Sequence, residues 1–113
     1  MENCIFCRII EGRAPAKVVY EDESVVAVED LNPQAPVHLL VIPKRHFSSV
    51  LETDEGLEPL IGHLYRVAAH LARENQVAEG YRVVVNTGAG AGQSVFHLHL
   101  HMLGGRPFHW PPG

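Results

Sequence analysis

The sequence predicts an α+β fold in which one main helix packs on an antiparallel meander of strands. Helical spacing of apolar residues extends over only one long segment, whereas five strand-like runs recur, most of them joined by short turns. The 113 residues make one domain, residues 1–113, and the 46% of hydrophobic residues exclude a disordered chain.

The first half of the chain predicts a short helical turn followed by three strands. Gly12 and the Ala14–Pro15 step end the turn, and the polar pair Asp22–Glu23 divides two runs that fit a hairpin. Two prolines at 33 and 36 mark a loop, because proline supplies no N–H to a strand ladder. The turn is expected at residues 4–11, and the strands at residues 18–21, 24–29 and 37–42.

The main helix is predicted by an apolar stripe from Leu57 to Ala72, at three- and four-residue spacing. Pro59 falls in its first turn, where a missing N–H costs least, and the stripe ends near Asn75. Two further strands are expected at residues 81–85 and 95–103, and a loop of small residues, 87–92, lies between them. That loop lacks the Gly-Lys-Ser/Thr of a phosphate loop, so it is either a plain hairpin loop or one whose N–H groups approach a phosphate.

Charge and hydropathy exclude several classes of protein. Nine Lys and Arg against thirteen Asp and Glu give a net charge of -4, which argues against a nucleic-acid or anionic-membrane partner. The apolar runs are too short to span a bilayer, and the first residues lack the basic and apolar parts of a signal peptide. We therefore expect a cytoplasmic protein with no nucleic-acid and no membrane partner.

Three histidines, His97, His99 and His101, alternate with apolar residues near the C-terminus. Side chains on a strand alternate between its two faces, so these imidazoles would share one face at Cα separations of about 6.6 Å. Rings at that spacing can share a substrate phosphate, relay protons or bind a metal. The alternative is a solvent-facing strand that uses histidine as its polar residue, and three strict alternations argue against it.

The run from His97 to Leu103 matches the histidine-triad signature, His–apolar–His–apolar–His–apolar–apolar. Nearly the whole chain resembles, in order, the Hint branch of the histidine-triad (HIT) nucleotide-binding proteins. The other matching segments are residues 30–38, 41–44, 86–88, 92–95 and the terminal His-Trp-Pro-Pro-Gly of 109–113. The resemblance implies a HIT-like fold, a homodimer, and a hydrolase that cleaves purine nucleoside 5′-phosphoramidates, typically releasing AMP and an amine.

The resemblance also assigns the reacting residues. His99 corresponds to the nucleophile that forms a transient nucleotidyl-histidine, with its tautomer fixed by a backbone carbonyl. His101 and His38 correspond to supporting histidines that hold protons near the phosphate, and the reaction needs no metal. The first triad histidine, His97, belongs to the catalytic group, and the residues corresponding to contacts with the phosphate or the leaving group are Ser94, Asn86 and Gln93.

The nucleotide pocket follows from the same resemblance. Asp30 corresponds to the acid that accepts both ribose hydroxyls, although its position before Asn32–Pro33 also suits an Asx-type cap. Trp110 corresponds to a residue of a tail that packs across the dimer interface, near the leaving-group side of the partner's pocket. The slot for the purine ring corresponds to Ile5, Phe6, Ile9 and Leu31, residue types that composition alone would place in the core.

Cys4 and Cys7 are separated by two residues, a spacing that favours a metal or redox role over a structural disulfide in a reducing compartment. A CxxC pair by itself is a weak zinc signal. Some histidine-triad proteins complete such a pair with two histidines, which correspond here to His46 and His97. The four would make a closed, structural zinc site, and the alternatives are two buried free thiols or partial metal occupancy.

Other functions compete with the phosphoramidase. A nucleotide-binding regulatory or scaffold protein would not need a nucleophile, and a zinc-stabilised structural module would leave His99 and His101 unexplained. A dinucleoside polyphosphate hydrolase of the Fhit type is disfavoured by the short chain and its Trp-Pro-Pro-Gly end.

Overall fold

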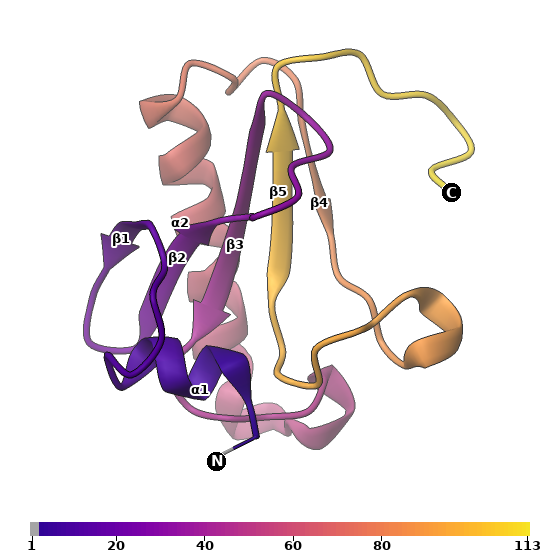
Figure 1. The fold of residues 1–113 in the computed structure, drawn as a ribbon. Helices are drawn as coiled ribbons and strands as arrows, with labels where there is room; N and C mark the ends of the chain where they lie inside the picture. The colour runs from indigo at the N-terminus through magenta and orange to yellow at the C-terminus, as the bar shows by residue number, and fades with distance from the viewer. Residues whose placement is uncertain (1–2) are drawn as a thin grey trace.

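The computed structural model describes residues 3–113 as a five-stranded sheet with a helix against each face (Figure 1). Helix α2 (Glu58–Glu74) covers one face, and the short helix α1 (Ile5–Ile10) lies against the other. The strands are β1 (Val18–Glu21), β2 (Val25–Glu29), β3 (Val37–Pro43), β4 (Tyr81–Val84) and β5 (Leu100–Gly104). Short 3-10 turns occupy Val50–Glu52, Glu55–Leu57 and Ala89–Ala91.

The sheet is antiparallel, with the strand order β1-β2-β3-β5-β4. The predicted α+β class with one main helix is confirmed, but the strands do not follow a simple meander. The last strand in sequence, β5, pairs with both β3 and β4, and β4 therefore lies at the edge. Strand β5 carries His101. Because β5 has a neighbouring strand on each side, its register and its side chains are fixed.

Alternating residues of the central strands fill two separate apolar layers. Leu39 and Val41 of β3 pack with Leu100 and Met102 of β5 under α2. On the opposite face, residues of β2 and β3 pack with α1; they are Val26, Val28, Leu40 and Ile42. The second layer includes the buried side chains of Cys4, Phe6 and Cys7, so α1 and its N-cap pack on the sheet through apolar contacts.

Helix α2 has the expected amphipathic character and boundaries. Pro59 lies in its first turn, and Asn75 follows its last residue and donates its side-chain N–H to the Leu71 carbonyl at 2.8 Å. The buried stripe consists of Leu64, Val67, Ala68, Leu71 and Ala72. Neither this helix nor any other within residues 3–113 is long and apolar enough to cross a membrane.

The last strand is shorter than the alternation predicted, because it starts at Leu100 and not at residue 95. Strand β3 ends at Pro43, which has no N–H, and the Pro43 carbonyl is bonded by the His97 ring at 2.8 Å. The ladder therefore stops, and the chain before Leu100 is anchored from a loop, by the Leu98 N–H donating to the Phe47 carbonyl at 2.7 Å. Leu98 still reaches the layer under α2, as the alternation predicts.

Candidate functional site

A cleft with a volume of about 290 Å³ opens beside α1, on the face of the sheet away from α2. Its polar groups come from the end of β2, from the loop before β5 and from β5 itself. They are Glu29, Asp30, Ser94, His99 and His101. The apolar wall contains all four residues predicted for the purine slot, Ile5, Phe6, Ile9 and Leu31, together with Pro15, Ala16, Val28, Leu40 and Val95.

The ring of His99 is held in one tautomer by a backbone group. His99 Nδ1 lies 2.7 Å from the His97 carbonyl oxygen, which can only accept, so Nδ1 carries the proton and Nε2 carries the lone pair. The ring is 7% exposed and packs edge-on against Phe6, with ring centroids 5.0 Å apart. Burial lowers the pKa of His99, although the His97 carbonyl and Asp30 oppose that effect. The ring is thus a neutral imidazole with a free lone pair.

His38 and His101 form a hydrogen-bonded pair whose direction is also set by the backbone. The Gln34 N–H donates to His38 Nδ1 at 3.0 Å, so His38 Nε2 carries a proton, which it donates to His101 Nδ1 at 2.9 Å. The remaining proton of His101 therefore lies on Nε2. The His101 ring is 4.9 Å from the ring of His99, so a proton donor stands beside the lone pair.

Burial lowers the pKa of both members of this pair. The pKa of His101 falls to about 4, because burial and the neighbouring His99 and His38 outweigh the carboxylate of Asp30. Burial also lowers the pKa of His38, against the opposing charge of Asp30. At neutral pH the pair is uncharged, and it can take up a proton when an anionic phosphate enters the cleft.

The position of Asp30 is compatible with both of its predicted roles, the Asx-type cap and the acid that binds ribose. One carboxylate oxygen accepts the Asn32 N–H at 2.8 Å, as the Asx-type cap requires. The other oxygen lies 3.4 Å from His38 Nε2, and the residue lines the cleft. Asp30, His38 and His101 also lie close enough together to resemble a metal triad, but the proton on His38 Nε2 occupies the lone pair that a metal would need.

The structure separates the three residues predicted to contact the phosphate. Ser94 is exposed and lines the cleft. The Gln93 side chain is buried: its oxygen accepts the Gly88 N–H at 2.8 Å, and its nitrogen donates to the carbonyls of Ser48 and Val95 at 2.6 and 3.1 Å. Gln93 therefore fixes the loop that carries Ser94. Asn86 is not among the residues that line the cleft.

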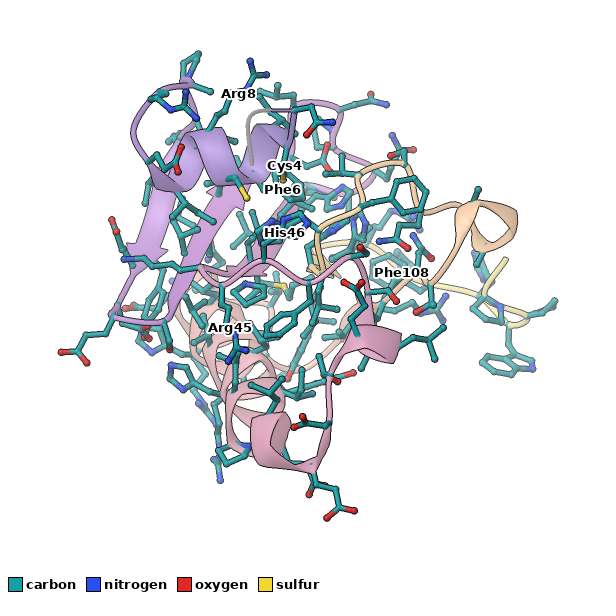
Figure 2. All side chains as sticks on the ribbon, turned by 90° about the horizontal axis from the view of Figure 1, so that it is seen from below. Cys4, Phe6, Arg8, Arg45, His46 and Phe108 are labelled. Atoms are coloured by element: carbon teal, nitrogen blue, oxygen red, sulfur yellow. The ribbon has the colours of Figure 1, made fainter. Side chains whose placement is uncertain are left out.

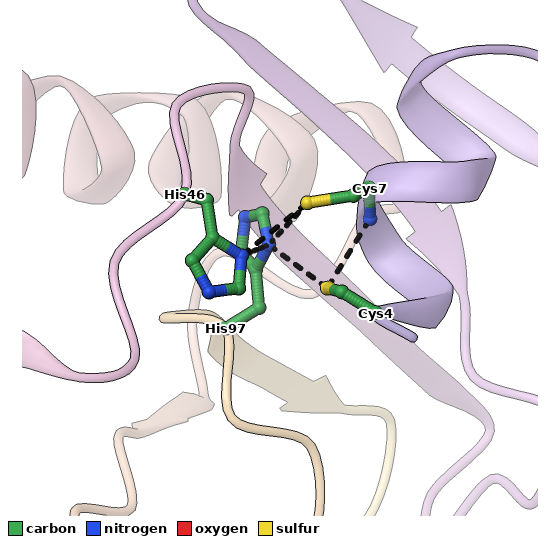
Figure 3. A group of neighbouring side chains, drawn as sticks. All are labelled: Cys4, Cys7, His46 and His97. Atoms are coloured by element: carbon green, nitrogen blue, oxygen red, sulfur yellow. Dashed lines mark hydrogen bonds between the residues drawn. The ribbon is translucent and has the colours of Figure 1, made fainter. Parts of the chain in front are cut away.

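A second cluster lies behind α1 and contains Cys4, Cys7, His46 and His97 (Figure 3). His97 Nδ1 is 3.3 Å from Cys4 Sγ, 3.6 Å from Cys7 Sγ and 3.0 Å from His46 Nδ1, and Cys7 Sγ is 3.3 Å from His46 Nδ1. Tetrahedral zinc, with Zn–S of about 2.3 Å and Zn–N of about 2.0 Å, separates its ligand atoms by roughly 3.3–3.8 Å. The four distances given above agree with these separations to within about 0.3 Å.

The chemistry of these four groups also fits a metal ion. His97 is fully buried, and its Nε2 donates to the Pro43 carbonyl, so the lone pair of Nδ1 points at the other three groups. Both thiols are buried, and burial together with the neighbouring Cys4 raises the pKa of Cys7 to about 11. The thiol of Cys7 therefore stays neutral unless a cation replaces its proton.

His97 connects the two clusters. Its ring belongs to the thiol cluster and does not line the cleft, and its carbonyl bonds His99. The catalytic role of His97 stays a prediction. Phe6 makes a parallel connection, because its ring lies edge-on to both His97 and His99 at 5.8 and 5.0 Å. Spacing along the sequence gave no signal for either link, nor for the bond from the Gln34 N–H to His38.

Trp110 lies on the C-terminal tail and is 84% exposed. The tail is attached through an Arg82 guanidinium N–H that donates to the His109 carbonyl at 3.0 Å. Arg82 and Arg106 also lie over the ring of Phe108, with their Cζ atoms 5.2 and 4.3 Å from its centroid. Trp110 is therefore a large aromatic side chain on a fastened segment, open to solvent within one chain.

Comparisons with known proteins agree with this geometry. The family model described as HIT domain matches residues 11–108. An uncharacterized HIT-like protein of Synechococcus elongatus is 48% identical over 112 residues, which cover 99% of this chain and 98% of that protein. A HIT family hydrolase from Legionella pneumophila is 46% identical with a TM-score of 0.96, covering 98% of this chain and 100% of that one. A HIT family hydrolase from Clostridium thermocellum is 45% identical with a TM-score of 0.93, and 96% of each chain is covered.

The lowered pKa of His101 predicts how stability depends on pH. Its folded pKa of about 4 lies below the ordinary value near 6.5, so between these values the unfolded chain binds more protons. The free energy of unfolding is then full above about pH 6.5 and falls toward pH 4, by up to ~1.4 kcal/mol per pH unit for this one group. We expect His101→Gln to reduce this slope in urea denaturation across that range.

The matched control is His70→Gln, which removes a half-exposed imidazole from α2 and should keep the slope of the unsubstituted protein. If both variants show the same dependence on pH, burial does not lower the pKa of His101.

Proposed function

The chain belongs to the HIT domain family, and we propose that it hydrolyses purine nucleoside 5′-phosphoramidates to AMP and an amine, through a nucleotidyl-histidine on His99. The observation that carries the proposal is the His97 carbonyl on His99 Nδ1, since it leaves Nε2 as a nucleophile in the cleft. A hydrolase is also the activity in the names of the similar Legionella and Clostridium proteins.

The first step transfers the nucleotidyl group to His99. A bond forms between His99 Nε2 and the phosphorus, the phosphorus–nitrogen bond breaks, and its electron pair leaves with the amine nitrogen. With the anionic phosphate bound, the His38–His101 pair has taken up one proton from solvent. The leaving nitrogen takes a proton from His101 Nε2, and the pair returns to its neutral form. The hydrogen bond from His38 to His101 Nδ1 supports this proton transfer, because it keeps a proton of His101 on Nε2, the nitrogen that is not bonded to His38.

The second step releases AMP. Water attacks the phosphorus, the bond to His99 Nε2 breaks, and the electron pair returns to the imidazole. The proton that water loses returns to solvent, so the two steps together consume one water molecule. Because His99 is neutral when free and cationic when it carries the nucleotidyl group, it serves both as nucleophile and as leaving group.

The substrate is held, in this proposal, by groups that the cleft already presents. The carboxylate of Asp30 would accept the ribose hydroxyls, and the exposed hydroxyl of Ser94 would contact the phosphate. The purine would lie on Phe6 and between Ile5 and Ile9 of α1, under the loop that carries Leu31, which is 95% exposed when the cleft is empty. Binding would cover that leucine.

Turnover of a fluorogenic adenosine 5′-phosphoramidate tests this function. We expect His99→Ala to lose about a thousandfold or more in kcat and still to bind AMP in calorimetry. Asp30→Ala should mainly raise KM, by about tenfold, because ribose contacts are alike in the ground and transition states.

The exposed His70→Gln serves as the control for loss of an imidazole. Equal turnover by the unsubstituted protein and His99→Ala would disprove the proposed activity. Faster hydrolysis of a diadenosine polyphosphate than of the phosphoramidate would assign a different substrate class.

We further propose that Cys4, Cys7, His46 and His97 hold a structural zinc ion. The separations of their ligand atoms and the tautomer of His97 support it. Bound there, zinc would cross-link α1 to the loop after β3 and to the segment before β5, with no ligand position left for water.

Metal analysis and thermal melting test the zinc site. We expect about one zinc ion per purified chain, and a Tm that falls by at least ~5 °C after chelation. Cys7→Ser should lack the ion and melt at the same temperature with and without chelator, whereas Ser94→Ala should behave as the unsubstituted protein does. An unchanged Tm after chelation, or a chain purified without zinc, would contradict the site.

We also propose a homodimer. Strand β4 lies at the sheet edge and carries the exposed Tyr81. The exposed Trp110 follows His109, whose carbonyl is bonded by Arg82 of β4. An apolar cavity of about 200 Å³ lies between α2 and the segment after β4, beside the half-exposed Tyr65. Sedimentation equilibrium should give twice the chain mass of 12.5 kDa, and the single-chain mass at micromolar concentration would contradict this proposal.

A further inference from the structure

A second cavity, of about 480 Å³, adjoins the cleft and is lined in part by Cys4 and His46 of the thiol cluster. It lies between α1, the loop after β3 and the segment before β5. Ile5, Ser94 and Val95 line both the cleft and this cavity, so the two spaces meet at the hydroxyl of Ser94. A substrate whose phosphate lies at Ser94 therefore has room for a further group on this side.

Among residues 3–113, the polar groups that line the cavity are Asn3, Cys4, Arg8, His46, Ser48 and Ser94, and none of them is a carboxylate. The Glu52 carboxylate does not line the cavity, but it accepts hydrogen bonds from Ser48. Such a lining is unusual in a chain with net charge -4, and it suits an anion rather than a cation. The one permanent charge among these groups is the guanidinium of Arg8, on α1 (Figure 2).

Arg8 is the residue that most needs a ligand. Its Nε is buried and has no hydrogen-bond partner among residues 3–113, and no ion pair there involves its guanidinium. A buried donor without a partner costs about 1–3 kcal/mol, and more when it is charged, so native proteins rarely leave one unused. By contrast, Arg13 pairs with Glu11, and Arg106 donates to the Gln34 carbonyl.

We propose that this cavity receives the leaving amine of the substrate and that Arg8 binds an anionic group on that amine, a carboxylate or a phosphate. The inference rests on the proposed function and narrows its substrate class to phosphoramidates whose amine carries an acid group, as amino acids do. A guanidinium matches a carboxylate or a phosphate with two parallel N–H bonds, and the hydroxyl of Ser94 adds a further donor. The base and the amine would then occupy opposite sides of the phosphate.

The test compares matched substrates that differ only in the charge of the leaving amine. These are the adenosine 5′-phosphoramidates of β-alanine, of its uncharged amide and of 2-aminoethylphosphonate. We expect kcat/KM to be about tenfold or more higher for an acidic amine than for the amide, as one charged hydrogen-bonded pair provides. In Arg8→Gln this ratio should fall to about one, and Arg8→Lys should retain part of it.

Arg73→Gln is the control, since it removes the same charge from an exposed position near the end of α2 and should keep the ratio of the unsubstituted protein. Preference for only one of the two acidic amines identifies the anion. A ratio near one in the unsubstituted protein, or a ratio unchanged by Arg8→Gln, would overturn this inference and leave the phosphoramidase standing. No hydrolysis of any of the three amidates would overturn both.

Discussion

The hydrogen bond from His99 Nδ1 to the His97 carbonyl, 2.7 Å long, is the interaction on which the rest of the site depends. This bond selects one of the two imidazole tautomers, the one that has its lone pair on Nε2 and directs it into the cleft. The carbonyl is itself held in place, because the ring of His97 bonds the Pro43 carbonyl and lies among Cys4, Cys7 and His46. The cluster behind α1 thus positions the nucleophile without touching a substrate.

Helix α1 brings the same two regions together from the other side. It is only six residues long, too short to be stable by itself. Its buried residues are Phe6 and Cys7, and Cys4 caps its N-terminus. Phe6 packs against His99 and lines the cleft, while Arg8 on the same helix lines the adjoining cavity. Whatever fastens α1 to the sheet therefore also shapes the space for the base and the space for the amine.

Local patterns in the sequence predict most of this fold, whereas most residues of the candidate site were assigned by the family resemblance. Alternation correctly assigns Leu98, Leu100 and Met102 to the core, and the helical stripe correctly bounds α2. The start of β5 and its place between β3 and β4 were not predictable in this way, because both depend on contacts far apart in sequence. The role of Gln93 was not predictable for the same reason, because its side-chain N–H donates to the carbonyl of Ser48, which lies 45 residues away in sequence. The ring of His97 points to the thiols because its segment lies outside the ladder.

The most direct test of the account is to find the covalent intermediate. The protein is mixed with an adenosine 5′-phosphoramidate, the reaction is stopped by rapid denaturation at neutral or alkaline pH, which preserves a phosphorus–imidazole bond, and the peptides are sequenced by mass spectrometry. We predict an added adenylyl group on His99 and on no other histidine, and none in His99→Ala. Turnover without any adduct, or an adduct on a different residue, would contradict the role of the His97–His99 bond.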